Sequence, residues 1–562
     1  MNYWATELPT FDVMKRASSW LTQCSSGGTC SGFTGTAGTW DTQEESRLAL
    51  DADGYPLSLP AATDTTVKYR KVTTVLSSTN VLPLGQYTIL YDGSGKLAYG
   101  GSVSIVSTSA GRDVVNLTST NHGSFWLTIT ATDPANHLRN IRVYMPGGAC
   151  SNDLGTYAAS AAACTTGKGS YVPFEAFPSA AGIWNPQFLA DVKGFRTLRF
   201  MDWGNTNSTM VSNWSDRPSA TTRVWSSGVP LEWMFDLANR VGADPWINIP
   251  AHATDDYVTQ AAKLAVQTLD ASRTVNMEYA NEPWNYAFPA TKWMLAQAQA
   301  AWPADVAAGA NVYELENNWY ARRLVQTCSL AKGAVAGGAS RFRCIANTQA
   351  AQPTQTDQVL KCTYAARTLG QACAKYIDAV AIAPYFGYYV GNTSLRTVVD
   401  SWMSSADGGL TQLFQELTGK NATGSTAPAL LASYNSGAPG GAIAQAASWM
   451  TGQQAVISTK YGLPMWAYEG GQHLLPNAGD TDTGFVNLTI AANRDPRMGA
   501  AYQQMMAAWQ AAGGQTFVYY SHASTPTKTG SWGMKETMTD NDNAKWLAAT
   551  AVRDSACWWS GC

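Results

Sequence analysis

Met277-Glu278-Tyr279-Ala280-Asn281-Glu282-Pro283-Trp284-Asn285 is the point at which an apolar, strand-like run ends in Asn-Glu-Pro, with aromatic residues on both sides. A carboxyl group at a strand end, beside an amide that bonds hydroxyls and a Trp ring that stacks on sugars, suits the chemistry of glycosidic bonds. That chemistry requires two carboxyl groups facing each other across the bond. The second candidate is Glu469, in the segment Pro464-Met465-Trp466-Ala467-Tyr468-Glu469-Gly470-Gly471.

Around this stretch, short apolar strands alternate with amphipathic helical segments, which is the pattern of a parallel α/β fold. Eight such strands predict a closed (β/α)8 TIM barrel. An open doubly wound sheet is the alternative, but no Gly-x-Gly-x-x-Gly follows any strand. The predicted strands are residues 197–203, 245–252, the run that ends at Glu282, 343–348, 379–386, 465–469 and 516–522, with residues 1–6 as a candidate eighth.

Residues 65–146 break this alternation, because they contain only strand and turn patterns. We expect an antiparallel, sandwich-like β-rich module inserted between barrel strands 1 and 2. The predicted division is a discontinuous barrel from residues 1–50 and 174–562, the module at 65–146, and connecting loops at 51–64 and 147–173. The module is expected to pack against the barrel, with carbohydrate binding as the alternative.

Composition excludes several classes of partner. Charged residues make up 14% of the 562 residues, which is low against about a quarter in typical proteins. The net charge is −3 and there is no basic run, so neither nucleic acid nor a membrane surface is an expected partner. No apolar run reaches the length of a membrane span. The 22 Trp and 25 Tyr are an excess of aromatic residues, which suits an oligo- or polysaccharide partner. We expect the protein to be a monomer.

The ten cysteines predict an oxidising compartment. They fall in sequence-near pairs, without Cys-x-x-Cys or a histidine at zinc-ligand spacing, so short-loop disulfides are favoured over a metal site. We therefore expect a secreted, extracellular protein whose chain begins at a mature or trimmed terminus. The expected pairs are Cys24/Cys30, Cys150/Cys164, Cys328/Cys344, Cys362/Cys373 and Cys557/Cys562.

The candidate site lies where the predicted strands end, because side chains at the carboxyl ends of barrel strands converge on one open face. This face is rich in groups for acid–base chemistry and for bonding hydroxyls. It has no nucleophile elbow and no His–His–carboxylate set, so we expect neither a metal nor a cofactor. The candidate substrate-binding residues are Glu7, Arg199, Trp203, His252, Asn281, Trp284, Tyr385, His473 and Trp532.

With Asn281-Glu282 on the fourth strand, Tyr385 on the sixth and Glu469 ending the seventh, the chain resembles the clan A glycoside hydrolases. These are retaining (β/α)8 glycosidases that include cellulases, xylanases and mannanases. The resemblance covers the predicted barrel and not the β-rich module, and it identifies no numbered family.

The resemblance implies a role for each matching residue. Glu282 would be the general acid/base and Glu469 the nucleophile, with Asn281 bonding the 2-hydroxyl of the sugar in the −1 subsite. Tyr385 would hold Glu469 ionised, and Arg199 would support it electrostatically. The clan's Trp on strand eight has no match in residues 518–522, and Trp532 in the following loop is the candidate for its place.

Other carboxyl and imidazole groups have structural interpretations. Glu278 is expected to be a buried carboxylate bonded to a basic neighbour such as Arg199, in preference to a catalytic group. His252 and His473 are expected to be structural or to bond substrate, in preference to shuttling protons.

The sequence thus predicts a secreted retaining glycoside hydrolase that cleaves β-linked polysaccharide with two glutamates. Long segments after strands one, four and six would form walls over the site. A walled cleft favours internal attack on a β-1,4-glucan or xylan-type chain. The alternative is a non-catalytic carbohydrate-binding protein on a degenerate glycosidase barrel.

Overall fold

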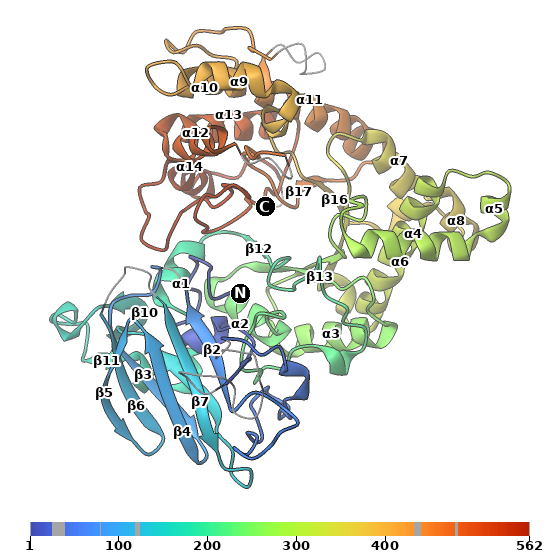
Figure 1. The fold of residues 1–562 in the computed structure, drawn as a ribbon. Helices are drawn as coiled ribbons and strands as arrows, with labels where there is room; N and C mark the ends of the chain where they lie inside the picture. The colour runs from blue at the N-terminus through green and yellow to red at the C-terminus, as the bar shows by residue number, and fades with distance from the viewer. Residues whose placement is uncertain are drawn as a thin grey trace. The chain divides into compact units, whose positions relative to one another are not determined.

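A computed structural model describes residues 2–24, 40–78, 80–118, 124–431, 440–477, 482–560 and 562. The chain forms two compact units (Figure 1). The first contains Met1–Lys193 and Arg217–Trp233, and the second contains Gly194–Asp216 and Met234–Cys562. No described helix combines the length and the apolar character needed to cross a membrane.

The second unit is built on a parallel sheet with helices between its strands. Its strands pair in chain order and are β12 (Thr197–Arg199), β13 (Asp244–Ile249), β14 (Val275–Tyr279), β15 (Phe342–Asn347), β16 (Ala379–Ile382) and β17 (Met465–Ala467). Helix α2 (Leu231–Val241) begins in the first unit and continues into the second. The other helices of the second unit are α3 (Asp255–Thr268), α4 (Pro289–Ala301), α5 (Pro303–Ala307), α6 (Val312–Gly333), α7 (Pro353–Lys361), α8 (Thr363–Leu369), α9 (Arg396–Trp402), α10 (Leu410–Thr418), α11 (Gly441–Gln454), α12 (Thr483–Arg494), α13 (Pro496–Ala511) and α14 (Ala544–Arg553).

The predicted alternation of strands and helices is confirmed in this unit. Parallel neighbours require crossover connections, and helices provide them: α3 lies between β13 and β14, and α7 and α8 lie between β15 and β16. Every residue of β14 is buried, as expected of a strand covered on both faces.

A seventh parallel segment follows the six strands. Ala467 of β17 forms a parallel bridge with Phe517, and the Val518 N–H donates to the Ala467 carbonyl at 3.1 Å. The seven parallel segments predicted between residues 197 and 522 are therefore all present, the last of them as a bridged segment rather than a regular strand.

The strand register places a charged network and part of the core on the same face of the sheet. Arg199 pairs with Trp246, and Asn248 pairs with Glu278, so these side chains project to one side, since alternate residues of a strand share a face. Trp246 also belongs to a buried cluster with Ile345, Ala379, Ala381 and Tyr468.

The first unit is mostly antiparallel β-structure. Its sheets have the strand orders β1-β2-β7-β4, β5-β6-β3-β8 and β10-β9-β11. The elements are β1 (Leu21–Gln23), β2 (Lys71–Ser77), β3 (Gly85–Asp92), β4 (Gly95–Gly101), β5 (Val103–Ser109), β6 (Arg112–Leu117), β7 (Phe125–Thr132), β8 (Arg139–Tyr144), β9 (Gly148–Cys150), β10 (Asp153–Ala158), β11 (Tyr171–Pro173) and α1 (Pro186–Val192).

The two four-stranded sheets pack against each other through apolar side chains. Tyr87 of β3 meets Phe125 of β7 edge to face, with ring centroids 5.5 Å apart. Only Gly93 and Ser94 separate β3 from β4, yet the two strands belong to different sheets. Gly93, at φ 90°, passes the chain from one sheet to the other.

Two details of the predicted organisation are wrong. Residues 2–6 form no strand, because the carbonyls of Asn2, Tyr3 and Ala5 accept hydrogen bonds from the buried Arg16 guanidinium and do not join a ladder. Among the described residues, the β-rich module thus precedes every parallel strand instead of following a first one. The predicted loop 147–173 is also partly ordered, as the sheet β10-β9-β11.

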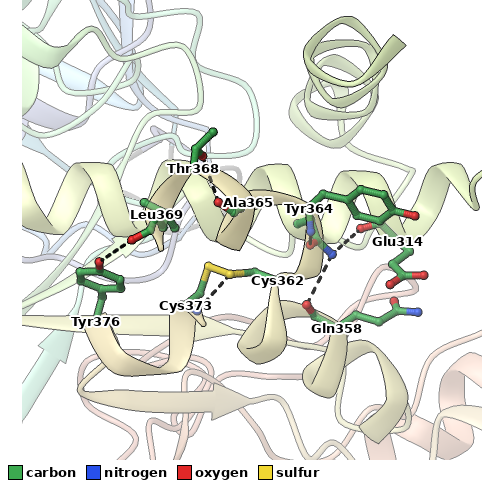
Figure 2. The surroundings of a disulfide bond; sticks show 10 residues. Glu314, Gln358, Cys362, Tyr364, Ala365, Thr368, Leu369, Cys373 and Tyr376 are labelled. Carbon is green, nitrogen blue, oxygen red and sulfur yellow. Dashed lines mark hydrogen bonds between the residues drawn. A yellow bond between two sulfur atoms is a disulfide. The ribbon is translucent and has the colours of Figure 1, made fainter. Parts of the chain in front are cut away.

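Four of the expected disulfides are present: Cys150–Cys164, Cys328–Cys344, Cys362–Cys373 and Cys557–Cys562. Cys328–Cys344 joins α6 to β15. Figure 2 shows Cys362–Cys373, in which the Cys373 N–H also donates to the Cys362 sulfur at 3.0 Å. The remaining predicted pair includes Cys30, which lies outside the described residues.

Helix α6 contains a buried carboxyl group that predicts a pH-dependent stability. Glu316 is 1% exposed, its Oε1 lacks a hydrogen-bond partner among the described residues, and burial raises its pKa well above the ordinary value. The folded state therefore keeps a proton that the unfolded state loses above about pH 4.3, so the free energy of unfolding falls as pH rises.

We expect Glu316→Gln to remove this dependence. The wild-type protein should lose stability relative to the variant between about pH 5 and about pH 8, as measured by urea unfolding at both values. Parallel changes in the two proteins would contradict a proton held at Glu316.

Candidate active site

The Asn281-Glu282 segment turns sharply after β14. Ala280 and Glu282 have φ values of 58° and 43°, in the left-handed region that side chains other than Gly rarely adopt. Such strain persists where the surrounding structure holds it, and it is concentrated at functional sites. Both Asn281 and Glu282 are buried, so the turn presents an amide and a carboxyl group from a largely enclosed position.

Glu469 lies just after the end of β17, and two glycines follow it where the chain passes close to other side chains. A Cβ on Gly470 would lie 2.6 Å from the Phe517 ring, and one on Gly471 would lie 2.6 Å from the Tyr502 hydroxyl. Gly471 also has φ 141°, which favours glycine. The two glycines are thus required by the close approach of the chain to Phe517 and Tyr502.

Arg199 connects the two carboxyl-bearing segments. Its Nη1 donates to Glu469 Oε2 at 3.0 Å, and its Nη2 donates to Asn281 Oδ1 at 2.7 Å. The side chain of Arg199 is only 3% exposed, so these bonds lie away from solvent, where charge-assisted hydrogen bonds are strong.

Glu278 balances part of the Arg199 charge, as the sequence predicted. It accepts two bonds from Arg199, one from Nε to its Oε2 and one from Nη2 to its Oε1, both 2.9 Å long. The Trp246 indole donates to Oε2 at 2.7 Å and the Asn347 amide to Oε1 at 2.9 Å. Four donors therefore occupy both oxygens of Glu278, which leaves none directed toward a substrate.

Glu282 is bonded by neutral groups. The Tyr468 hydroxyl donates to its Oε1 at 3.0 Å, and the Asn285 amide donates to its Oε2 at 2.8 Å. Glu469, in contrast, bonds directly to a guanidinium. The two carboxyl groups thus differ in the charge of their nearest donors.

Burial is the largest influence on the protonation of this pair. It raises the pKa of both Glu282 and Glu469, and the negative charge of Glu282 further raises the pKa of Glu469. The Arg199 charge opposes this rise at both carboxyl groups, and it is the strongest opposing influence at Glu469. Since one cation faces several carboxyl groups, the pair favours a single proton, and the direct Arg199 bond favours the charge on Glu469 and the proton on Glu282.

An aromatic cluster joins several of the predicted substrate-binding residues. The ring of His473 lies 5.0 Å from that of Tyr385 and 5.6 Å from that of Trp532. Trp532 in turn lies 5.7 Å from the ring of Tyr520. Burial lowers the pKa of His473 to about 4, so its imidazole is neutral at neutral pH, which agrees with a structural or substrate-bonding group.

Tyr385 is near Glu469 but is not bonded to it among the described residues. Burial and the Glu469 charge both raise the pKa of the Tyr385 phenol, so this hydroxyl stays protonated. Its predicted contact with the nucleophile remains a prediction.

The loop that carries Trp532 is held in place by two buried side chains, Gln472 and Lys545. Gln472 donates to the Ser531 carbonyl at 2.5 Å, and the Lys545 ammonium donates to the same carbonyl at 2.8 Å. Trp532 is thereby fixed on the side of His473, to whose Nδ1 its indole N–H lies 3.4 Å away.

The remaining predicted residues are less closely tied to the pair. The Trp284 indole N–H is buried and lacks a partner among the described residues, and its role in substrate binding remains a prediction. His252 packs against Trp293, with ring centroids 4.4 Å apart, and Trp203 packs against Phe200 at 5.3 Å. Glu7 belongs to the first unit, and its role remains a prediction.

Sequence reasoning missed Tyr468, Asn285, Trp246 and Asn347 as partners of the site carboxyls. Trp246 and Asn347 were detectable in principle, because they lie on predicted strands at positions that share a face with Glu278. Tyr468 was not detectable, because no strand pattern indicates that its hydroxyl bonds Glu282 while its neighbour Glu469 bonds Arg199.

The described residues contain no group of three or more His, Cys, Asp and Glu side chains arranged to hold a metal ion. The chemistry that these groups can perform is proton transfer and nucleophilic attack by carboxylates.

No family model and no curated protein matches the sequence. The chain is similar to several solved structures. One is a GH5-4 broad specificity endoglucanase from an uncultured bacterium, with 12% identity, 64% of this chain and 82% of that chain covered, and a TM-score of 0.30. Another is an endo-beta-1,4-mannanase from Cellulomonas fimi, with 10% identity, coverage of 66% and 72%, and a TM-score of 0.30.

A third is native xylanase10C from Cellvibrio japonicus, with 11% identity, coverage of 96% and 98%, and a TM-score of 0.33. These three solved structures are an endoglucanase, a mannanase and a xylanase.

Proposed function

We propose that this protein is a retaining glycoside hydrolase in which Glu282 is the general acid/base and Glu469 the nucleophile. The observation that carries the proposal is the asymmetric environment of two buried carboxyl groups. Glu469 bonds the Arg199 guanidinium, whereas the donors to Glu282 among the described residues are neutral. Two carboxyl groups whose surroundings separate their protonation states are the requirement of this mechanism.

In the first step, the Glu282 carboxyl donates its proton to the glycosidic oxygen as the bond to C1 breaks. Glu469 attacks C1 and forms a glycosyl ester, and the leaving sugar departs as an alcohol. Arg199 holds the Glu469 carboxylate in place before attack. Asn281, which accepts from Arg199 through its Oδ1, bonds the sugar 2-hydroxyl.

In the second step, Glu282 is a carboxylate and accepts a proton from water as the water oxygen attacks C1. The ester bond to Glu469 breaks, and the sugar is released with its original configuration. The Tyr468 and Asn285 donors stabilise Glu282 in this charged state.

We propose further that the seven parallel segments belong to a closed barrel and that the β-rich residues 65–146 are an accessory module. The Tyr520 hydroxyl donates to Asp202 Oδ2 at 3.0 Å, which supports closure because Asp202 follows β12 and Tyr520 follows the last parallel segment. This domain assignment places the catalytic machinery in the second unit.

The substrate proposed is a β-1,4-linked glucan or xylan-type chain cleaved internally outside the cell by a monomer. The cluster of Tyr385, His473, Trp532 and Tyr520 supports a sugar ligand, because aromatic faces with polar edges suit pyranose rings. The four disulfides support an oxidising compartment.

Product analysis on a panel of β-glucans, xylans, mannans and galactans tests this function. We expect release of reducing ends from at least one polysaccharide, with a rapid fall in chain length if cleavage is internal. Binding without any released reducing ends would favour the alternative, a non-catalytic carbohydrate-binding protein.

A further inference from the structure

Tyr468 is the residue before Glu469, yet its hydroxyl reaches the opposite carboxyl group. It donates to Glu282 Oε1 at 3.0 Å. The side chain has no solvent exposure, its ring belongs to the buried cluster with Trp246 and Ile345, and the Arg199 guanidinium lies 4.9 Å from its centroid. The direction of this hydroxyl is therefore fixed by packing on the core.

This contact provides a second link between the segments Asn281-Glu282 and Tyr468-Glu469. Arg199 bonds both Asn281 and Glu469, and it therefore links the segment Asn281-Glu282 to the segment Tyr468-Glu469. The Tyr468 hydroxyl links the same two segments directly, through its bond to Glu282. The distance and angle between the two carboxyl groups thus depend on a guanidinium and a phenol acting together. Small displacements of such groups are costly, because the reacting atoms must approach in alignment.

We propose that Tyr468 is a positioning residue that sets the orientation of the Glu282 carboxyl for both proton transfers. This inference rests on the proposed function. Tyr468 acts through Glu282, so it needs no contact with the sugar.

The chemistry of a buried phenol suits this task. Burial raises the pKa of Tyr468 well above its usual range, so the hydroxyl remains neutral while Glu282 changes charge. A phenol hydroxyl both donates and accepts, so it can bond the carboxylate in one step and the protonated acid in the other. Asn285 holds the second oxygen at 2.8 Å, which leaves the carboxyl plane little freedom.

Tyr468→Phe removes the hydroxyl and keeps the ring. The bond from Tyr468 lowers the pKa of Glu282 against the larger effect of burial, so its loss should raise that pKa. The alkaline limb of the kcat/KM profile, which reports loss of the acid's proton, should move to higher pH, and the acid limb should stay in place. We expect kcat on an oligosaccharide to fall about tenfold to about hundredfold.

Substrates with different leaving groups distinguish a positioning role of Tyr468 from a purely structural one. A dinitrophenyl leaving group needs no proton from Glu282 to depart, so the loss of kcat/KM in Tyr468→Phe, which reports the first step, should be much smaller on a dinitrophenyl glycoside than on an oligosaccharide. Equal losses on both substrates with unmoved limbs would overturn the proposal.

A matched control is Tyr87→Phe, which removes a buried hydroxyl that donates to the Pro83 carbonyl at 2.6 Å in the first unit. It should leave both limbs unchanged. Asn285→Ala, which removes the other donor to Glu282, should move the alkaline limb in the same direction as Tyr468→Phe and gives a second variant if the first fails to fold.

The outcome is distinguishable from failure of the proposed function. If Glu282→Gln is inactive and Tyr468→Phe behaves as wild type, the function stands and the role of Tyr468 falls. If no glycoside is turned over, the Glu282 carboxyl band, identified by its absence in Glu282→Gln, is titrated by infrared spectroscopy. An unchanged midpoint in Tyr468→Phe would then overturn the inference.

Discussion

Glu469→Gln and Glu282→Gln are each expected to lose most of the activity on a natural polysaccharide. Loss of a positioned acid/base group costs about 10²–10⁴-fold, and loss of the nucleophile should cost at least as much, because no ester can form. Glutamine keeps the size of the side chain and removes the ionisable group. The measurement is kcat/KM on the best substrate of the panel, with folding checked by circular dichroism.

Azide assigns the two roles. In Glu469→Ala it should occupy the space of the lost carboxylate and attack C1 directly, giving a glycosyl azide of inverted configuration. In Glu282→Ala with an activated substrate, it should attack the ester on Glu469 and give a product of retained configuration. Exchanged outcomes would reverse the assignment, and absence of rescue with an inverted hydrolysis product would contradict a retaining mechanism.

The control for these variants is Glu416→Gln. Glu416 has no solvent exposure and accepts from the Leu431 N–H at 2.8 Å, and it takes no part in the proposed mechanism. A loss of activity in this variant comparable to that of Glu282→Gln would show that removing any buried glutamate disrupts the fold.

Arg199→Met is expected to have the largest effect on stability. The change leaves Glu278, which has no exposed side-chain area, without its cation, and breaking a buried pair in this way costs about 3–5 kcal/mol. Activity should fall as well, because Glu469 loses the charge that favours its ionised form. Urea unfolding and kcat/KM measure the two effects on one sample.

The double variant Arg199→Met with Glu278→Gln separates the two contributions. The introduced glutamine would keep an acceptor for Trp246 or Asn347 while removing the uncompensated charge, so part of the lost stability should return. Activity should stay low, because Glu469 still lacks its cation. Recovery of both together would mean that Arg199 acts only on the fold.

Much of the second unit is determined by local patterns. Strand β15 is a short, mostly apolar run, and its observed bounds, Phe342–Asn347, differ by one residue from the predicted range of 343–348. The alternation of such elements restricts the fold to a parallel sheet with helical crossovers. Residues 2–6 were assigned wrongly because strand-like composition does not reveal that Arg16 takes their carbonyls.

The candidate pair itself was visible in the sequence, since Glu282 and Glu469 each end an apolar strand run and the order of the strands predicts that these ends converge. The Arg199–Glu278 pair was predicted as well, because a carboxylate buried within a strand requires a basic neighbour. These conclusions depend on periodicities of two and of about 3.6 residues, which are properties of the chain alone.

Only the tertiary structure decided how the site groups are shared. Nothing in the sequence indicates that Arg199 bonds Glu278, Asn281 and Glu469 at once, or that Tyr468 bonds Glu282 and not its own neighbour. The left-handed backbone at Ala280 and Glu282 was equally hidden. Hydrogen bonds between distant segments depend on side-chain directions and burial, and these are set by packing of the whole sheet and not by any local pattern.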